Sequence, residues 1–284
     1  PYIMPGFALA KKAAEVYEED PSVEGLILLG HGHFAFGQTA EKSYNQIISH
    51  TQTVADYFNL ENPTALNVKA SHSSHGVLPV IRGLIADMIG PNAAMPIIDV
   101  RNGPEEMKFL KRDDLKSLSE RGTASPDHVI RIKGRPLVLR KSVWEQGRSA
   151  IKEALKDYEI EYKAMFERQA PKAAQPKTIL PPDPKTIWME GVGLRGLGAN
   201  FKSASIAGDL VVQNARVRSV GEAAGGFYPI GEKDLFDCEY WSLEQAKLGK
   251  GKAPPFQGKV VMVTGGSGTI GFETARAFST LGAQ

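Results

Sequence analysis

The chain has 284 residues, of which 42% are hydrophobic, so it is long enough to form one large domain or two of ordinary size. Its 34 Lys and Arg residues are interspersed with 32 Asp and Glu residues, and this balance makes nucleic acid an unexpected partner. Cys238 is the single cysteine, which excludes an internal disulfide and a cysteine-rich zinc module and is typical of a reducing, cytoplasmic location.

The sequence contains no feature of a membrane protein. No apolar stretch approaches the roughly 20 residues of a membrane-spanning helix, and residues 1–6 lack the basic and apolar regions of a signal peptide. The first residue is Pro1 instead of methionine, and the chain stops at Gln284 just after a predicted helix. We therefore expect an internal segment of a longer protein, with no membrane partner.

The first hundred residues predict alternating helices and strands. Residues 5–17 are expected to be a helix, and residues 24–30 form a short apolar run typical of a buried strand. After a loop over 31–38, Thr39 can cap a helix with one apolar face. That face comprises Ala40, Tyr44, Ile47, Ile48 and Val54. The next expected elements are a polar loop over 62–74, a helix over 77–89 and a strand over 95–100.

Later segments repeat this pattern. The apolar spacing over 143–165 predicts an amphipathic helix packed through one face, and residues 169–184, rich in Pro, Ala and Lys, are expected to be a surface loop. Residues 186–191 predict a strand, residues 192–198 a glycine turn, and Asn200 the start of a helix. The spacing of the glycines matches that of an earlier pair. The two pairs are Gly193 with Gly198 and Gly32 with Gly37.

The strongest motif lies at the end of the chain, where residues 260–263 predict a strand, residues 264–271 a glycine-rich turn, and the following residues a helix to about Leu281. In a dinucleotide-binding turn the first glycine makes a tight bend, the second lets the backbone approach the pyrophosphate, and the third lets helix and strand pack closely. Free N–H groups at the helix start favour the phosphates. The candidate cofactor-binding residues are Thr264, Gly265, Ser267, Gly268, Thr269, Ile270 and Gly271.

This motif resembles the opening of the short-chain dehydrogenase superfamily, and the resemblance implies a Rossmann-type domain that binds NAD or NADP. Thr269 stands where the commonest spacing has glycine, so the motif is closer to the extended members. The residue that selects NAD or NADP follows the next strand, and the superfamily's Ser and Tyr-x-x-x-Lys follow later. The chain ends before both, so we expect no catalytic residue in it. The alternative is a fortuitous glycine loop.

A second motif surrounds His31. Residues 26–37, Leu-Ile-Leu-Leu-Gly-His-Gly-His-Phe-Ala-Phe-Gly, resemble the class II aldolase and adducin family around its last metal-binding histidine, and His31 is the matching position. The resemblance implies zinc or another divalent metal, which polarises a ketose oxygen and stabilises the enediolate formed when a carbon–carbon bond breaks. The family's other ligands, a His-x-His pair and an acid, would precede Pro1. The alternative is a hydrogen-bonded turn histidine.

The other histidines and the cysteine have simpler interpretations. His33 is expected to be a surface or packing residue, because the family usually has an apolar residue at this position. His72 and His75 have a spacing that can bind a metal, yet no further ligand supports a site there. Cys238 has acidic neighbours that disfavour a thiolate, so we expect it to be a packing residue.

Residues 123–133 resemble the segment around the aldolase family's His-x-His pair, with Thr123 and Ser125 in the histidine positions. In the later glycine turn, Val192 occupies the place of His31. The resemblance implies a second aldolase-like copy without histidine ligands, with a structural or substrate-shaping role; an unrelated α/β insertion is the alternative. Three nearby cationic residues can bind a phosphate or carboxylate, or form a solvated basic edge. They are His128, Arg131 and Lys133.

The order of these pieces, including residues 237–247, is similar to the bifunctional rhamnulose-1-phosphate aldolase and alcohol dehydrogenase family over essentially the whole chain. The resemblance implies an α/β fold with class II aldolase-like layers, possibly in a second, degenerate copy, followed by the first β-α unit of a Rossmann-type domain. The expected domains are the C-terminal part of an aldolase-like domain over 1–62, the degenerate region over 63–250, and the dehydrogenase start over 251–284.

The resemblance implies a sugar-catabolic parent enzyme that cleaves a deoxyketose 1-phosphate to dihydroxyacetone phosphate and lactaldehyde, then oxidises the aldehyde with NAD or NADP. The expected partners are sugar phosphates, small aldehydes and further copies in a homo-oligomer. The segment itself lacks complete active sites and is expected to be inactive. The alternative function is a non-catalytic aldolase-like interaction or oligomerisation module on a short-chain dehydrogenase.

Overall fold

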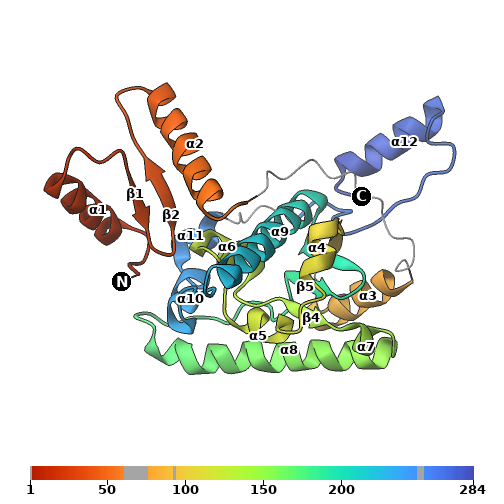
Figure 1. Ribbon diagram of the computed structural model, residues 1–284. Helices are drawn as coiled ribbons and strands as arrows, with labels where there is room; N and C mark the ends of the chain where they lie inside the picture. Colours follow the sequence, from red (N-terminus) through yellow and green to blue (C-terminus); the bar gives the residue numbers. More distant parts are fainter. Residues whose placement is uncertain (1, 61–75, 92–93, 248–252) are drawn as a thin grey trace.

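The computed structural model describes residues 2–60, 76–91, 94–247 and 253–284. Its central element is a four-stranded sheet in the order β3–β6–β5–β4, in which β4 and β5 are parallel and the other pairs are antiparallel. The strands are β3 (Ile97–Arg101), β4 (Leu137–Leu139), β5 (Thr186–Met189) and β6 (Gly193–Gly198). A separate antiparallel hairpin, β1 (Gly25–Leu28) and β2 (Gly32–Ala35), lies with the first two helices at one side of the molecule (Figure 1).

Helices cover both faces of the four-stranded sheet, with α8 along one face and α9 along the other (Figure 1). The helices that precede β3 in the chain are α1 (Phe7–Glu19), α2 (Ala40–Tyr57) and α3 (Val77–Ile89). Those between β3 and β5 are α4 (Pro104–Phe109), α5 (Leu115–Glu120), α6 (Pro126–Ile132), α7 (Lys141–Trp144), α8 (Arg148–Gln169) and the 3₁₀ turn η2 (Ala170–Lys172). The last are α9 (Phe201–Ala223), α10 (Glu232–Glu239), α11 (Ser242–Lys247) and α12 (Thr269–Thr280).

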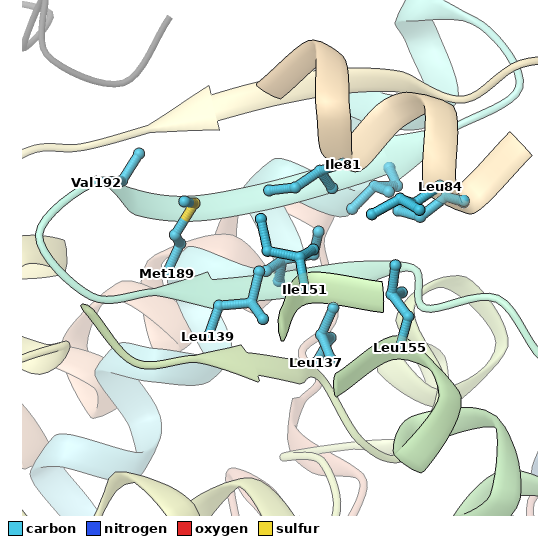
Figure 2. Packing of buried hydrophobic residues seen from close by; sticks show 11 residues of the cluster. Ile81, Leu84, Leu137, Leu139, Ile151, Leu155, Met189 and Val192 are labelled. Atoms are coloured by element: carbon cyan, nitrogen blue, oxygen red, sulfur yellow. The ribbon is translucent and has the colours of Figure 1, made fainter. Parts of the chain in front are cut away.

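The main hydrophobic core lies between the sheet and helices α3 and α8 (Figure 2). Successive strand side chains point to opposite faces of a sheet, so Ile187 and Met189 of β5 enter this core while Trp188 enters the opposite one. Burying a side chain of this size contributes roughly 1.5–3 kcal/mol. The buried members are Ile81, Leu84, Ile85, Leu137, Leu139, Ile151, Leu155, Ile187, Met189, Val192 and Leu197.

On the opposite face, α9 packs directly on the backbone of β6. A Cβ atom on Gly196 would overlap the backbone nitrogen of Gly208 and the carbonyl oxygen of Ala204, so the strand and helix meet only because side chains are absent. Asn200 begins α9 with a capping box, in which its side chain accepts from the Ser203 amide. The sheet is therefore buried on both faces, as three packed layers.

Several predicted elements are confirmed. The helix over 77–89 coincides with α3, the strand over 95–100 overlaps β3, and the strand at 186–191 contains β5. Thr39 caps α2 and accepts a hydrogen bond from the Lys42 amide. The long helix predicted over 143–165 begins instead at Arg148, because Gly147 has φ +89° and separates it from α7. The predicted loop over 62–74 lies outside the described residues, and the loop over 169–184 contains the last residue of α8, Gln169, followed by η2.

Three predictions about local structure are wrong. The expected loop over 31–38 contains β2, and the expected glycine turn over 192–198 contains β6, whose glycines serve close packing instead of chain reversal. The apolar face predicted for α2 is largely exposed, with Tyr44 65% and Ile48 51% accessible. Among the described helices, none combines the length and apolar character that crossing a membrane needs.

The strand predicted over 260–263 is also not formed. Two parallel-type hydrogen bonds are present, from the Val261 amide to the Gln284 carbonyl at 2.8 Å and from the Gln284 amide to the Lys259 carbonyl at 2.9 Å. No further ladder extends them within the described residues, and Met262 is 90% exposed. The helix expected after the glycine turn is confirmed as α12.

Candidate functional site

The glycine turn before α12 bends the backbone tightly against the start of the helix. Gly265 has φ +70°, a left-handed conformation that glycine adopts without strain, and its carbonyl accepts from the Gly268 amide at 3.0 Å. A Cβ atom on Gly271 would overlap this same Gly265 carbonyl. The first turn of α12 therefore lies directly against the bend, and both glycines are required at their positions.

The start of α12 also offers unpaired hydrogen-bond donors. Gly268 is the N-cap and supplies no side-chain hydrogen bond, and the first turn contains no acidic residue. The first amide that donates within the helix is that of Phe272, which bonds the Gly268 carbonyl at 2.8 Å, so the preceding amides of Thr269, Ile270 and Gly271 remain available to an anion. Together with the positive end of the helix dipole, they fit the pyrophosphate of a dinucleotide. The seven residues predicted to contact the cofactor thus lie within one turn and the following helical turn.

His31 lies in the turn between β1 and β2, where its Nε2 is 2.7 Å from the carbonyl oxygen of Ile3 and its ring stacks on Tyr2 at 4.9 Å. Because a carbonyl can only accept, Nε2 carries the proton and Nδ1 is the nitrogen free to ligate a metal. Across the described part of the chain, no group of three or more His, Cys, Asp or Glu side chains could hold a metal ion. These residues therefore do not by themselves fit a zinc centre.

The other candidate ligands occupy ordinary positions. His33 Nε2 lies 3.0 Å from Nδ1 of His50, a hydrogen bond that matches the expected surface or packing role. Cys238 is 1% exposed and its sulfur is 3.2 Å from the Tyr2 hydroxyl, which confirms that it is a packing residue. His72 and His75 lie outside the described residues.

Thr123, Ser125 and Val192 occupy the positions where the aldolase resemblance implies lost histidine ligands, and their surroundings differ. Val192 is 2% exposed and packs in the core with α3 and α8. Thr123 is 2% exposed and its hydroxyl donates to the Ser125 carbonyl at 3.2 Å, while Ser125 Oγ lies 2.8 Å from Nδ1 of His128. These contacts are structural, and none of the three side chains is an imidazole or carboxylate.

Comparison with known proteins decides the family. Residues 72–248 match the family described as aldolase class II, second domain. The chain belongs to this second-domain family. It is also 28% identical, over 300 residues and 99% of its length, to the "Uncharacterized oxidoreductase YuxG" of Bacillus subtilis (strain 168), and it spans 42% of that protein's length. No solved structure matches significantly.

The second-domain region includes the whole four-stranded sheet, whereas His31 and residues 264–271 lie outside it. Within this region, His128 and Lys133 do not form the solvated basic edge that was one expectation for residues 128–133. His128 and Lys133 are each 5% exposed, and burial lowers the pKa of both, to about 8 for Lys133. They do not converge on one anion site, because His128 contacts Ser125 while the Lys133 amine lies over the Tyr162 ring.

Proposed function

We propose that this chain is part of a longer sugar-catabolic enzyme with two activities. The first is metal-dependent cleavage of a deoxyketose 1-phosphate, of the rhamnulose 1-phosphate type, to dihydroxyacetone phosphate and lactaldehyde. The second is oxidation of the aldehyde with NAD or NADP. The observation that carries the proposal is the tight turn formed by Gly265, Gly268 and Gly271 at the start of α12, on a chain that belongs to an aldolase second-domain family.

In this proposal the parts of the chain have separate roles. The amides at residues 269–271 would hold the cofactor's pyrophosphate, and NAD or NADP bound there would supply the hydride acceptor for oxidation of the hydrated aldehyde to a carboxylate. His31 is the last ligand of the metal, with its remaining ligands outside the described residues. The second-domain region shapes and supports the site, since Thr123, Ser125 and Val192 offer no metal-binding side chain.

Product analysis on the native full-length enzyme tests this assignment. Rhamnulose 1-phosphate is supplied with NAD and a divalent metal, and dihydroxyacetone phosphate, lactaldehyde and lactate are quantified together. His31→Ala is expected to stop release of dihydroxyacetone phosphate. Gly271→Ala is expected to preserve it while lactaldehyde accumulates and lactate disappears. Cleavage that is unaffected by both His31→Ala and a chelator contradicts the aldolase half.

The second candidate function is a non-catalytic interaction or oligomerisation module attached to a dehydrogenase. It is favoured by one observation, that no three-ligand group exists among the described residues of the second-domain region. Under this alternative the native enzyme forms no dihydroxyacetone phosphate, yet it reduces NAD when lactaldehyde is added directly. The same product assay therefore separates the two functions.

A further inference from the structure

A cavity of about 340 Å³ opens beside α8 and α10, inside the second-domain region. Small-molecule sites have volumes of roughly 300–1,000 Å³ and mainly apolar walls with a few polar groups. The walls of this cavity are mainly aromatic and aliphatic. They include Tyr158, Met165, Phe227, Ile230, Leu235 and Phe236. None of the residues assigned above to cofactor or metal binding lines it.

Three polar residues that line this cavity are almost completely buried. Lys133 is 5%, Glu239 4% and Tyr162 7% exposed. Buried ionisable groups are costly unless they are paired and fully hydrogen-bonded. No direct salt bridge joins Lys133 to Glu239 among the described residues, although both line the cavity and each electrostatically favours the charged form of the other. Their burial is therefore not explained by a mutual salt bridge.

The hydrogen bonds around Glu239 have a defined direction. The Leu180 amide, which can only donate, bonds the Tyr240 hydroxyl at 3.3 Å. Tyr240 and Tyr162 hydroxyls are 2.8 Å apart, and Tyr162 donates to Oε1 of Glu239 at 2.6 Å. Each tyrosine proton is thus used in turn, and Glu239 is the final acceptor. Within the described residues no donor bonds Oε2, so this oxygen can accept from a ligand.

Lys133 supplies the complementary donor. Its amine donates to the Pro181 carbonyl at 2.5 Å and lies 3.9 Å from the centre of the Tyr162 ring. An ammonium has three protons, and these contacts leave donor capacity on a residue that lines the same cavity as Glu239. A hydroxyl group can donate to a carboxylate and accept from an ammonium at once. An anion would be attracted by Lys133 but repelled by Glu239, and a cation would meet the reverse.

We propose that this cavity binds a small, uncharged polyhydroxy compound, with one hydroxyl between Lys133 and Glu239 and its C–H face against the aromatic walls. A neutral ligand adds no further charge beside the buried Lys133 and Glu239. Other charged lining residues are already paired with carboxylates, Arg121 with Glu222 and Arg135 with Glu161. The ligand completes the hydrogen bonds of both residues. This site is independent of the proposed cleavage and oxidation, because neither His31 nor the glycine turn takes part in it.

Saturation-transfer NMR on the native enzyme tests the proposal with three probes that share one ring. Methyl β-D-glucoside is neutral, the corresponding uronate is an anion, and the corresponding 2-amino sugar is a cation. The neutral glycoside is expected to bind about tenfold or more tightly than either charged analogue, the effect of about one well-formed hydrogen bond. Equal or tighter binding of a charged analogue overturns the proposal, and so does the absence of binding by all three.

Two variants locate the binding. Gly134→Leu is expected to abolish it, because a Cβ atom at Gly134 lies 3.7 Å from Leu235 Cδ1 and the larger side chain extends along the cavity wall. Glu239→Gln is expected to weaken it about tenfold, whereas Glu161→Gln, at an exposed lining carboxylate, leaves it unchanged. Undiminished binding by folded Gly134→Leu, verified by circular dichroism, overturns the assignment even if Glu239→Gln fails to fold.

Discussion

The hydroxyl of Tyr162 in α8 donates a 2.6 Å hydrogen bond to Oε1 of Glu239 at the end of α10, and both side chains are less than 10% exposed. Burial raises the pKa of the Glu239 carboxyl and the pKa of the Tyr162 phenol. The contact joins α8 and α10, which are far apart in the sequence, through two side chains that line the cavity.

Removing that hydroxyl is expected to destabilise the fold. Tyr162→Phe leaves a buried carboxyl oxygen without its donor, which costs about 1–3 kcal/mol of unfolding free energy. Tyr158→Phe is the matched control, because its hydroxyl donates to a backbone carbonyl, that of Arg135, at 3.1 Å. Urea unfolding of both variants measures the difference. Equal losses contradict a special role for the buried carboxyl contact.

Two glycines with different surroundings are expected to respond in opposite ways to alanine. Gly83→Ala in α3 meets nothing within 4 Å of the new Cβ atom and is expected to raise the unfolding free energy by up to about 1 kcal/mol. Gly196→Ala forces α9 away from β6, and the resulting overpacking is expected to cost about 1–3 kcal/mol or more. Thermal unfolding compares them. Tolerance of alanine at Gly196 contradicts direct packing of the two backbones.

Glu232 gives an acid-dependent contribution to stability. Hydrogen bonds from Arg168 and Gln169 lower its pKa to about 2, from an ordinary value of 4.5. Since the folded-state pKa is the lower one, the stabilisation is present above pH 4.5 and is lost as the pH falls towards 2. Glu232→Gln is expected to be less stable than wild type by about 1 kcal/mol at neutral pH, after allowance for solvent screening. The gap should close at low pH; a constant gap contradicts this account.

Lys133 makes the stability of the fold depend on pH in alkaline solution. Burial lowers its pKa from 10.5 to about 8, so the folded state releases this proton before the unfolded chain does. Stability from this residue therefore rises between pH 8 and 10.5. Relative to Lys133→Met, wild type is expected to gain up to about 3 kcal/mol over that window. Lys116→Met, at a side chain 77% exposed, is the control and should show no such slope. An identical slope for Lys133→Met and wild type would refute burial of the amine.

Locally encoded features could be predicted from the sequence. Thr39 and Asn200 cap α2 and α9 because each bonds an amide three residues later, so a few residues contain the whole interaction. The glycine turn is likewise a short-range motif. The packing role of Gly196 and Gly198 in β6 could not be predicted, because each glycine makes room for the α9 backbone, and the residues around position 196 do not reveal that contact.

The cavity could not be found in this way. Tyr162 fits the apolar spacing of α8, and spacing alone gives it only a packing role. Lys133 is part of a basic sequence, yet the packing of α8 and α10 removes it from water. The partners Tyr162 and Glu239 belong to different helices, so only the tertiary structure brings them together.

The central claim is that the turn before α12 binds the pyrophosphate of NAD or NADP, and NADH fluorescence titration of the native enzyme tests it most directly. Gly271→Ala introduces a Cβ atom that overlaps the Gly265 carbonyl, whereas Gly266→Ala places one at an acceptable 3.4 Å from the Val263 carbonyl. We predict saturable binding by wild type and Gly266→Ala, weakened at least about tenfold in Gly271→Ala. Equal NADH affinity in all three folded proteins would contradict a cofactor site at this turn.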